Sequence, residues 1–94
     1  MKQLMVFVPN SAEELQDIVF DSYPSIISLK RIQDIKSVEL SNLLKYRSNI
    51  VLCDVSHKIL TVFNILKLDT AFNISADVYT AINTYSATEI YMRS

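Results

Sequence analysis

The chain contains no glycine and no tryptophan, and only two prolines and one cysteine. Walker and Rossmann phosphate loops depend on glycine, because a residue without Cβ lets backbone N–H groups come close to a phosphate. The absence of glycine therefore excludes a nucleotide site of either type.

An excess of charge of one sign is also missing. The 9 Lys and Arg residues and the 10 Asp and Glu residues give a net charge of -1, and they are spread along the chain. No basic run is present that would neutralise several phosphates in a row. Nucleic acid is therefore not an expected partner.

Long apolar runs are absent as well. The longest, residues 4–9 and 50–53, are far shorter than the roughly 18 to 20 residues that span a bilayer. No signal-peptide pattern is found at the start of the chain. We predict a cytoplasmic protein without membrane insertion. Because 50% of the residues are hydrophobic, we expect one compact domain over residues 1–94.

The single cysteine, Cys53, lies in an apolar segment and has no partner for an internal disulfide. We expect it to be a small buried side chain in a reducing compartment. His57 is the only histidine, so Cys53 or Asp54 with His57 is the nearest approach to a catalytic pair. Strand alternation turns Cys53 into the sheet, whereas His57 is expected to open a helix in an exposed position. We predict no enzymatic activity, no metal site and no cofactor.

Three apolar segments fit β-strands: residues 3–8, 25–32 and 49–55. They are rich in β-branched and aliphatic residues, as strands covered on both faces are. The third contains no proline and is predicted to lie inside the sheet. The final segment, residues 87–94, fits either an added edge strand or a tail.

Four segments have apolar residues at helical spacing. Ser11 and Glu14 form a capping-box pattern for the first helix, which is predicted to run about three turns and to close before Pro24. Ser37 and Ser56 are predicted to cap the second and third helices, and Ser75 with Asp77 is predicted to open the fourth. The predicted inward residues are Leu40, Leu43 and Leu44, then Ile59, Val62, Phe63 and Leu66, then Val78, Ala81, Ile82 and Tyr85.

Alternation of strands and helices predicts an α/β fold, a small parallel or mixed sheet covered by about four helices. Within that pattern the chain resembles a STAS domain, the fold of bacterial anti-sigma-factor antagonists and of modules in anion and lipid transporters. The family pattern runs V-L-D-L-S, I-D-S-S-G-L-G-x-L-L, V-S, L-D-x-x-F and S-x-E-E-A-L. The matching segments here are 26–32, 35–44, 51–56, 63–72 and 77–82, with Leu68-Asp69 and Phe72 at the family spacing.

The turn before the second helix departs from the family pattern. In regulated members the second serine of D-S-S-G is phosphorylated, and that position matches Val38. The family aspartate matches Lys36, and the two glycines match Glu39 and Ser41. The serine switch is therefore expected to be lost or moved to Ser37, at a helix N-terminus that favours a phosphate. The first family strand is also missing.

The resemblance implies a non-catalytic regulatory module of bacterial type that docks a protein partner through residues 34–47. Lys36 and Glu39 are expected to select the partner by charge around an apolar centre at Val38. The implied partner is an anti-sigma kinase-like protein, another STAS scaffold or a transporter ATPase. The predicted contact residues are Lys36, Ser37, Val38, Glu39, Ser41 and Lys45.

Two alternatives remain open from the sequence, and a third combination, a receiver-like site, is set aside. A structural subunit would form a homodimer or larger homo-oligomer through an open sheet edge at residues 3–8 or 90–93. A phosphotransfer protein would use Ser37 as the phosphoacceptor. A receiver-like site would use Asp34 and Asp54 at strand ends, although the first predicted strand ends in Val8-Pro9-Asn10 and supplies no acidic pair.

Overall fold

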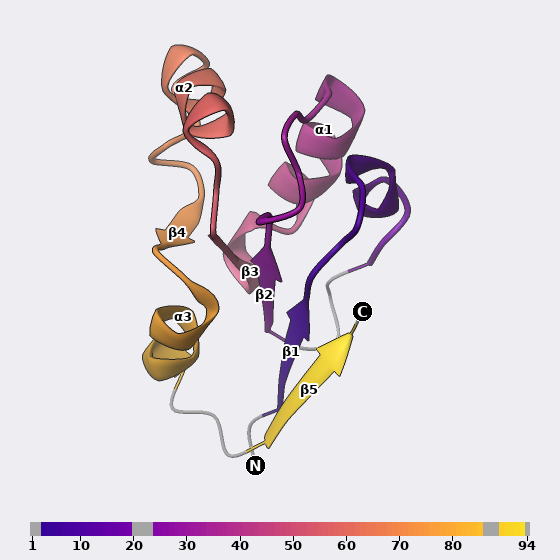
Figure 1. The fold of residues 1–94 in the computed structure, drawn as a ribbon, viewed down its shortest axis with the longest axis vertical. Coiled ribbons are helices and arrows are strands. Elements are labelled where there is room, and N and C mark those ends of the chain that lie inside the picture. Colours follow the sequence, from indigo (N-terminus) through magenta and orange to yellow (C-terminus); the bar gives the residue numbers. More distant parts are fainter. Residues whose placement is uncertain (1–2, 20–23, 86–88, 94) are drawn as a thin grey trace.

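The computed structural model describes residues 3–19, 24–85 and 89–93 (Figure 1). The strands are β1 (Gln3–Phe7), β2 (Ser25–Ser28), β3 (Ile50–Cys53), β4 (Asn73–Ser75) and β5 (Glu89–Arg93). The α-helices are α1 (Ser37–Lys45), α2 (His57–Ile65) and α3 (Val78–Tyr85), and the short 3-10 helices are η1 (Ala12–Leu15) and η2 (Arg47–Asn49).

The five strands form one sheet in the order β4-β3-β2-β1-β5, and every neighbouring pair is parallel. The predicted α/β fold is confirmed, with the sheet parallel throughout these strands rather than mixed. β3 lies between β4 and β2, as its uninterrupted apolar sequence predicted.

The helices divide between the two faces of the sheet. β2, β3 and β4 are each added on the same side of the strand before them. Connections of the same handedness therefore place η1, α1 and α2 on the same face of the sheet. The chain then returns past β1 to add β5, which places α3 on the opposite face. Figure 1 shows α3 well apart from α1 and α2.

Two apolar cores follow from this division. Within β3, Ile50 and Leu52 belong to the core under η1, α1 and α2, whereas Val51 and Cys53 belong to the core under α3. This alternation is the two-residue period of a strand covered on both faces. The first core contains Leu15, Leu40, Leu43, Ile59, Phe63 and Phe72, and the second contains Leu4, Val6, Ile26 and Ala81.

The first predicted helix is wrong beyond its start. A Glu14 carboxyl oxygen accepts a hydrogen bond from the Ser11 N–H at 3.0 Å, as the capping-box pattern implies, but the helix is only the 3-10 turn η1. The Asn42 amide of α1 donates to the Leu15 carbonyl at 2.7 Å and to the Ile18 carbonyl at 3.0 Å. These contacts occupy carbonyls that a continuing helix would use. The remainder of that prediction, residues 20–23, lies outside the described residues.

Other features of the fold also differ from the predictions. β2 ends at Ser28 rather than residue 32, because the Ile32 N–H donates to the Leu29 carbonyl at 3.0 Å and closes a turn. β4 was not predicted, since it has three residues, none of them fully buried. Leu66, predicted to face inward, caps the end of α2 and is 54% exposed.

The order of strands also corrects one edge hypothesis. β1 is paired on both sides, by β2 and β5, so residues 3–8 do not form an open edge. Within the last segment, residues 89–93 form the edge strand β5 rather than a tail, and β4 forms the other edge. None of the helices in the described ranges is long and apolar enough to cross a membrane.

Candidate functional site

The start of α1 lies where the sequence placed the docking surface. The N-cap is Lys36, in an extended conformation with φ -99° and ψ 168°, and not Ser37 as predicted. The Lys36 carbonyl accepts the first helical hydrogen bond, from the Leu40 N–H at 3.0 Å. Ser37 is therefore the first helical residue, exposed and without a capping role.

Glu39 holds this turn from inside. Its side chain is 1% exposed. Oε1 accepts from the Lys36 N–H at 3.0 Å, and Oε2 accepts from Nε2 of Gln16 at 2.7 Å. A glutamate three residues after the N-cap reaches back to the cap N–H in this way. The expectation that Glu39 presents its charge to a partner is therefore corrected: the side chain is buried and stabilises the turn.

The outer side of the same turn is exposed. Val38 is 56% exposed, and Ser41 and Lys45 follow it three and seven residues later, which places the three on one face of the helix. The Lys45 ammonium lies 5.5 Å from the centroid of the Tyr46 ring, a cation–π contact. We name these exposed residues the α1 face: Lys36, Ser37, Val38, Ser41 and Lys45.

An ion pair connects this turn with α2. Oδ2 of Asp34 lies 3.7 Å from Nζ of Lys58, while Oδ1 accepts from the Ile35 N–H at 3.0 Å. Both charged side chains are mostly exposed, so the pair contributes little free energy. It does place the first turn of α2 next to the start of α1.

A second polar group lies at the carboxyl ends of β2 and β3. The buried Ser28 hydroxyl donates to Oδ2 of Asp54 at 2.7 Å, and the Cys53 thiol lies 3.8 Å from the same oxygen. Burial, and then the negative charge of Asp54, raise the pKa of Cys53 to about 12. The thiol therefore stays protonated near neutral pH and is a poor nucleophile.

The receiver-like and Cys–His combinations that the sequence analysis considered do not come together among the described residues. Asp34 contacts Lys58, whereas Asp54 contacts Ser28, and no hydrogen bond joins Cys53 to His57 among the described residues. His57 is exposed at the start of α2, as predicted. The predicted cap is also present, because the Ser56 hydroxyl accepts a hydrogen bond from the Ile59 N–H at 3.2 Å. In the part of the chain that the structure describes, no group of three or more His, Cys, Asp or Glu side chains is placed to hold a metal ion.

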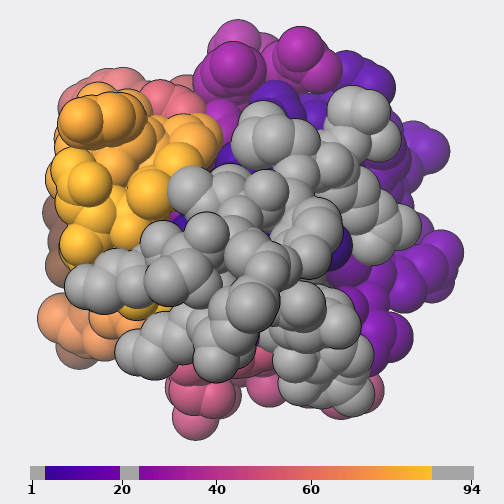
Figure 2. All heavy atoms as spheres, turned by 90° about the horizontal axis from the view of Figure 1, so that it is seen from below, coloured from indigo at the N-terminus to yellow at the C-terminus, as the bar shows by residue number. Residues whose placement is uncertain are grey.

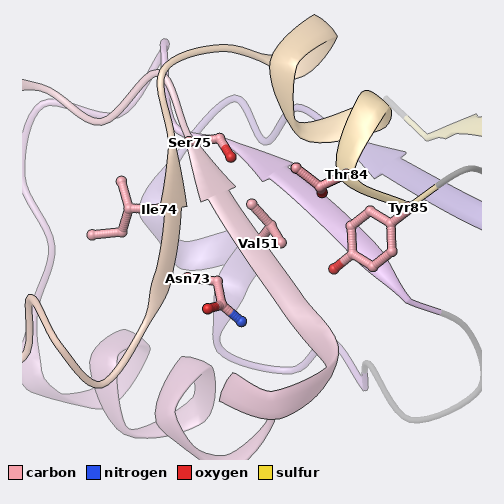
Figure 3. Close-up of a pocket in the computed structure, with 6 residues that line it drawn as sticks. All are labelled: Val51, Asn73, Ile74, Ser75, Thr84 and Tyr85. Carbon is pink, nitrogen blue, oxygen red and sulfur yellow. The ribbon is translucent and has the colours of Figure 1, made fainter.

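The sequence did not reveal a pocket on the α3 side of the sheet. Its volume is about 360 Å³, and it lies between β4, β3 and the last turn of α3 (Figure 3). Its described lining residues are Val51, Asn73, Ile74, Ser75, Thr84 and Tyr85. It was missed because β4 was missed, so nothing in the sequence brought Asn73 and Ser75 next to Tyr85.

Comparison with models of known protein families, with curated proteins and with solved structures found no match to this chain.

Proposed function

We propose that this protein is a non-catalytic interaction module that docks a protein partner through the α1 face. The observation that carries the proposal is the contrast within one helical turn between exposed Val38 and buried Glu39. A solvent-facing aliphatic side chain on a turn that is fixed from below is a suitable centre for a protein interface.

The hydrogen bonds of Glu39 support this role. They hold the backbone of Lys36 and connect it to Gln16, so the exposed side chains stand on an ordered turn before any partner arrives. Such preorganisation lowers the entropic cost of binding. Lys36 and Lys45 flank Val38 on the exposed surface, so the complementary surface carries carboxylates around an apolar contact.

The resemblance to STAS domains suggests the type of partner. It points to a bacterial regulatory system in which this chain binds an anti-sigma kinase-like protein, another STAS scaffold or a transporter ATPase. Val38 stands at the family's phosphoserine position, so binding does not depend on phosphorylation there. A cytoplasmic location is consistent with Cys53, a free and buried thiol.

The test is a pair of substitutions at exposed hydrophobic positions. Val38→Asp places a charge at the centre of the α1 face, and Tyr79→Asp places the same charge on α3, where Tyr79 is 76% exposed. Binding is measured by isothermal titration calorimetry against a candidate partner from one of the three types named above. Val38→Asp is expected to bind at least tenfold more weakly than the parent chain, whereas Tyr79→Asp is expected to keep the Kd of the parent chain. Equal affinities for Val38→Asp and the parent chain would refute the assignment of the surface.

The edge position of β5 favours a second candidate, a homo-oligomer built by strand pairing. Among the described strands β5 pairs only with β1, so its outer edge is suited to accept another strand. Light scattering after size exclusion distinguishes this candidate, which requires an oligomer that deletion of residues 87–94 disrupts or enlarges. A monomer at all concentrations argues against it.

Ser37 supports a third candidate, phosphotransfer. Its hydroxyl is exposed in the first turn of α1, where the helix N-terminus favours a phosphate. Incubation with candidate kinases, followed by intact-mass measurement of the parent chain and of Ser37→Ala, gives added phosphate in the parent alone if this candidate holds. No added mass on the parent chain excludes it for those kinases.

A further inference from the structure

The pocket between β4 and α3 combines an apolar floor with polar walls. Val51 of β3 forms the floor, with Asn73 and Ser75 of β4 on one side and Thr84 and Tyr85 of α3 on the other (Figure 3). The Ile74 side chain points away from the other lining residues, to the opposite side of β4 (Figure 3). Seen from below, α3 and β4 form adjoining parts of one flank of the molecule (Figure 2).

Unused hydrogen-bonding groups line this pocket. Among the contacts of the described residues, the Asn73 amide, the Ser75 hydroxyl and the Tyr85 hydroxyl have no hydrogen-bond partner, whereas the Thr84 hydroxyl donates to the Ala81 carbonyl at 2.7 Å. An asparagine amide offers one acceptor oxygen beside two donor hydrogens, and a tyrosine hydroxyl can donate or accept. The pocket thus presents donors and acceptors from two opposite walls.

The described part of the lining offers no charged side chain that would attract an ion. None of the six described lining residues is Asp, Glu, Lys, Arg or His. A charged ligand would lose hydration without gaining an opposite charge. Partial burial raises the pKa of Tyr85, so its hydroxyl stays protonated at neutral pH and remains a hydrogen-bond donor.

From these observations we infer that the pocket binds a small, uncharged, planar molecule with a carboxamide edge, or an equivalent adjacent donor and acceptor. The carboxamide pairs with the Asn73 amide, the ring lies on Val51 beside the Tyr85 ring, and the Tyr85 hydroxyl meets an acceptor on the ligand. A volume of about 360 Å³ is within the range of small-molecule sites. The pocket shares no residue with the α1 face, so this inference stands or falls independently of the docking proposal.

Nicotinamide and nicotinate form a suitable pair of probes, because they share a ring and differ in having a neutral carboxamide or a carboxylate. Titration of the 15N-labelled full chain, followed by two-dimensional NMR, is expected to give saturable shifts at Asn73, Ser75 and Tyr85 with nicotinamide. Nicotinate is expected to cause much smaller shifts there. Absence of saturable shifts with millimolar nicotinamide, or equal affinity for both probes, overturns the inference.

Matched variants test the residues. Tyr85→Phe removes one hydrogen bond and is expected to raise the Kd for nicotinamide about five- to tenfold, whereas Tyr79→Phe, on the exposed side of the same helix, is expected to leave it unchanged. Asn73→Asp keeps the side-chain size, replaces the donor with a charge and is expected to weaken binding at least as much. Unperturbed spectra away from the pocket establish that the variants are folded. An equal Kd for the two Tyr variants, or full binding by Asn73→Asp, contradicts the assigned contacts.

Discussion

The starts of α1 and α2 are held in different ways. At α2, the Ser56 hydroxyl accepts from the Ile59 N–H at 3.2 Å, so a residue of the cap itself satisfies the helix. At α1, no side chain of the N-cap does this: Glu39 accepts from the Lys36 N–H, and its other oxygen accepts from Gln16, 23 residues earlier in the chain.

This difference decides which side chain is used to fix each helix start. The local cap of α2 uses the hydroxyl of Ser56, while the start of α1 is fixed from the interior and leaves Ser37 and Val38 exposed. The start of α1 is therefore ordered by Glu39 and Gln16 while Ser37 and Val38 face solvent.

The largest expected effect tests the interior anchor. Glu39→Ala leaves the Lys36 N–H and the Gln16 amide without their acceptor and leaves a buried void, so we expect the free energy of unfolding to fall by about 2 kcal/mol. Urea unfolding followed by circular dichroism measures this change. Glu13→Ala, at an exposed position in η1, is the matched control and is expected to change stability by less than about 0.5 kcal/mol. Equal losses for both variants contradict the structural role of Glu39.

A pH titration tests the segment that leads into α2. The folded pKa of Cys53, about 12, lies above its ordinary value of 9.0. Between these values the unfolded chain releases the proton and the folded chain keeps it, so stability is complete below pH 9.0 and falls as the pH rises. Burial of this thiol is expected to lower the free energy of unfolding by about 1.4 kcal/mol at about pH 10, relative to its value at neutral pH.

Chemical unfolding across the alkaline range measures the effect, with Cys53→Ala as the comparison, since that variant lacks the thiol but keeps the other titrating groups. The pH dependence of the parent chain is expected to be steeper. Parallel profiles for the two proteins would show that burial of the thiol has no such linkage.

A pair of serine substitutions compares the two helix starts directly. Ser56→Ala removes the side-chain cap of α2 and is expected to lower stability by about 1 kcal/mol. Ser37→Ala changes an exposed first-turn residue without a capping contact, and we expect a change within about 0.5 kcal/mol. Thermal and urea unfolding give both values, and a larger loss for Ser37→Ala would reverse the assignment of the caps.

The ends of the helices differ as well, and the absence of glycine matters there. After α2, the Leu68 N–H donates to the Phe63 carbonyl at 2.7 Å and the Lys67 N–H to the Asn64 carbonyl at 3.1 Å, the hydrogen bonds of a Schellman motif. Lys67, the residue after the α2 cap, has φ 59°, a conformation that favours glycine, whereas Arg47, the residue after the α1 cap Tyr46, is not among the non-glycine residues with positive φ. Lys67→Gly is therefore expected to stabilise the protein by roughly 0.5 to 1 kcal/mol.

Arg47→Gly is the control for that substitution, since Arg47 is not among the non-glycine residues with positive φ. Glycine there adds freedom to the unfolded chain and removes the hydrogen bond from Nη1 of Arg47 to the Leu44 carbonyl at 3.0 Å, so we expect a loss of stability. Unfolding midpoints of the two variants on opposite sides of the parent value support the interpretation, and a loss in both contradicts it.

Much of the fold was predictable because the residues concerned act locally. The central apolar strand at Ile50–Cys53, the Ser56 cap and the buried Cys53 each follow from neighbouring residues. The length of the first helix was not predictable, because Asn42, far along the chain, binds the Leu15 and Ile18 carbonyls.

The candidate site divides in the same way. Lys36, Ser37, Val38, Ser41 and Lys45 are exposed, while their part in binding a partner stays a prediction. The burial of Glu39 was not visible, because a glutamate in the first turn of a helix usually faces solvent unless a distant partner such as Gln16 satisfies it.

By itself the sequence determined the α/β class, through alternating strand and helix patterns, and it excluded glycine-dependent phosphate loops. Only the tertiary structure decided that β1 lies between β2 and β5, that Glu39 points inward, and that Asn73 and Tyr85 line the same pocket. The physical reason is range: caps and periodicity depend on residues a few positions apart, whereas pairing of distant strands and burial of a polar group depend on partners that the fold alone brings together.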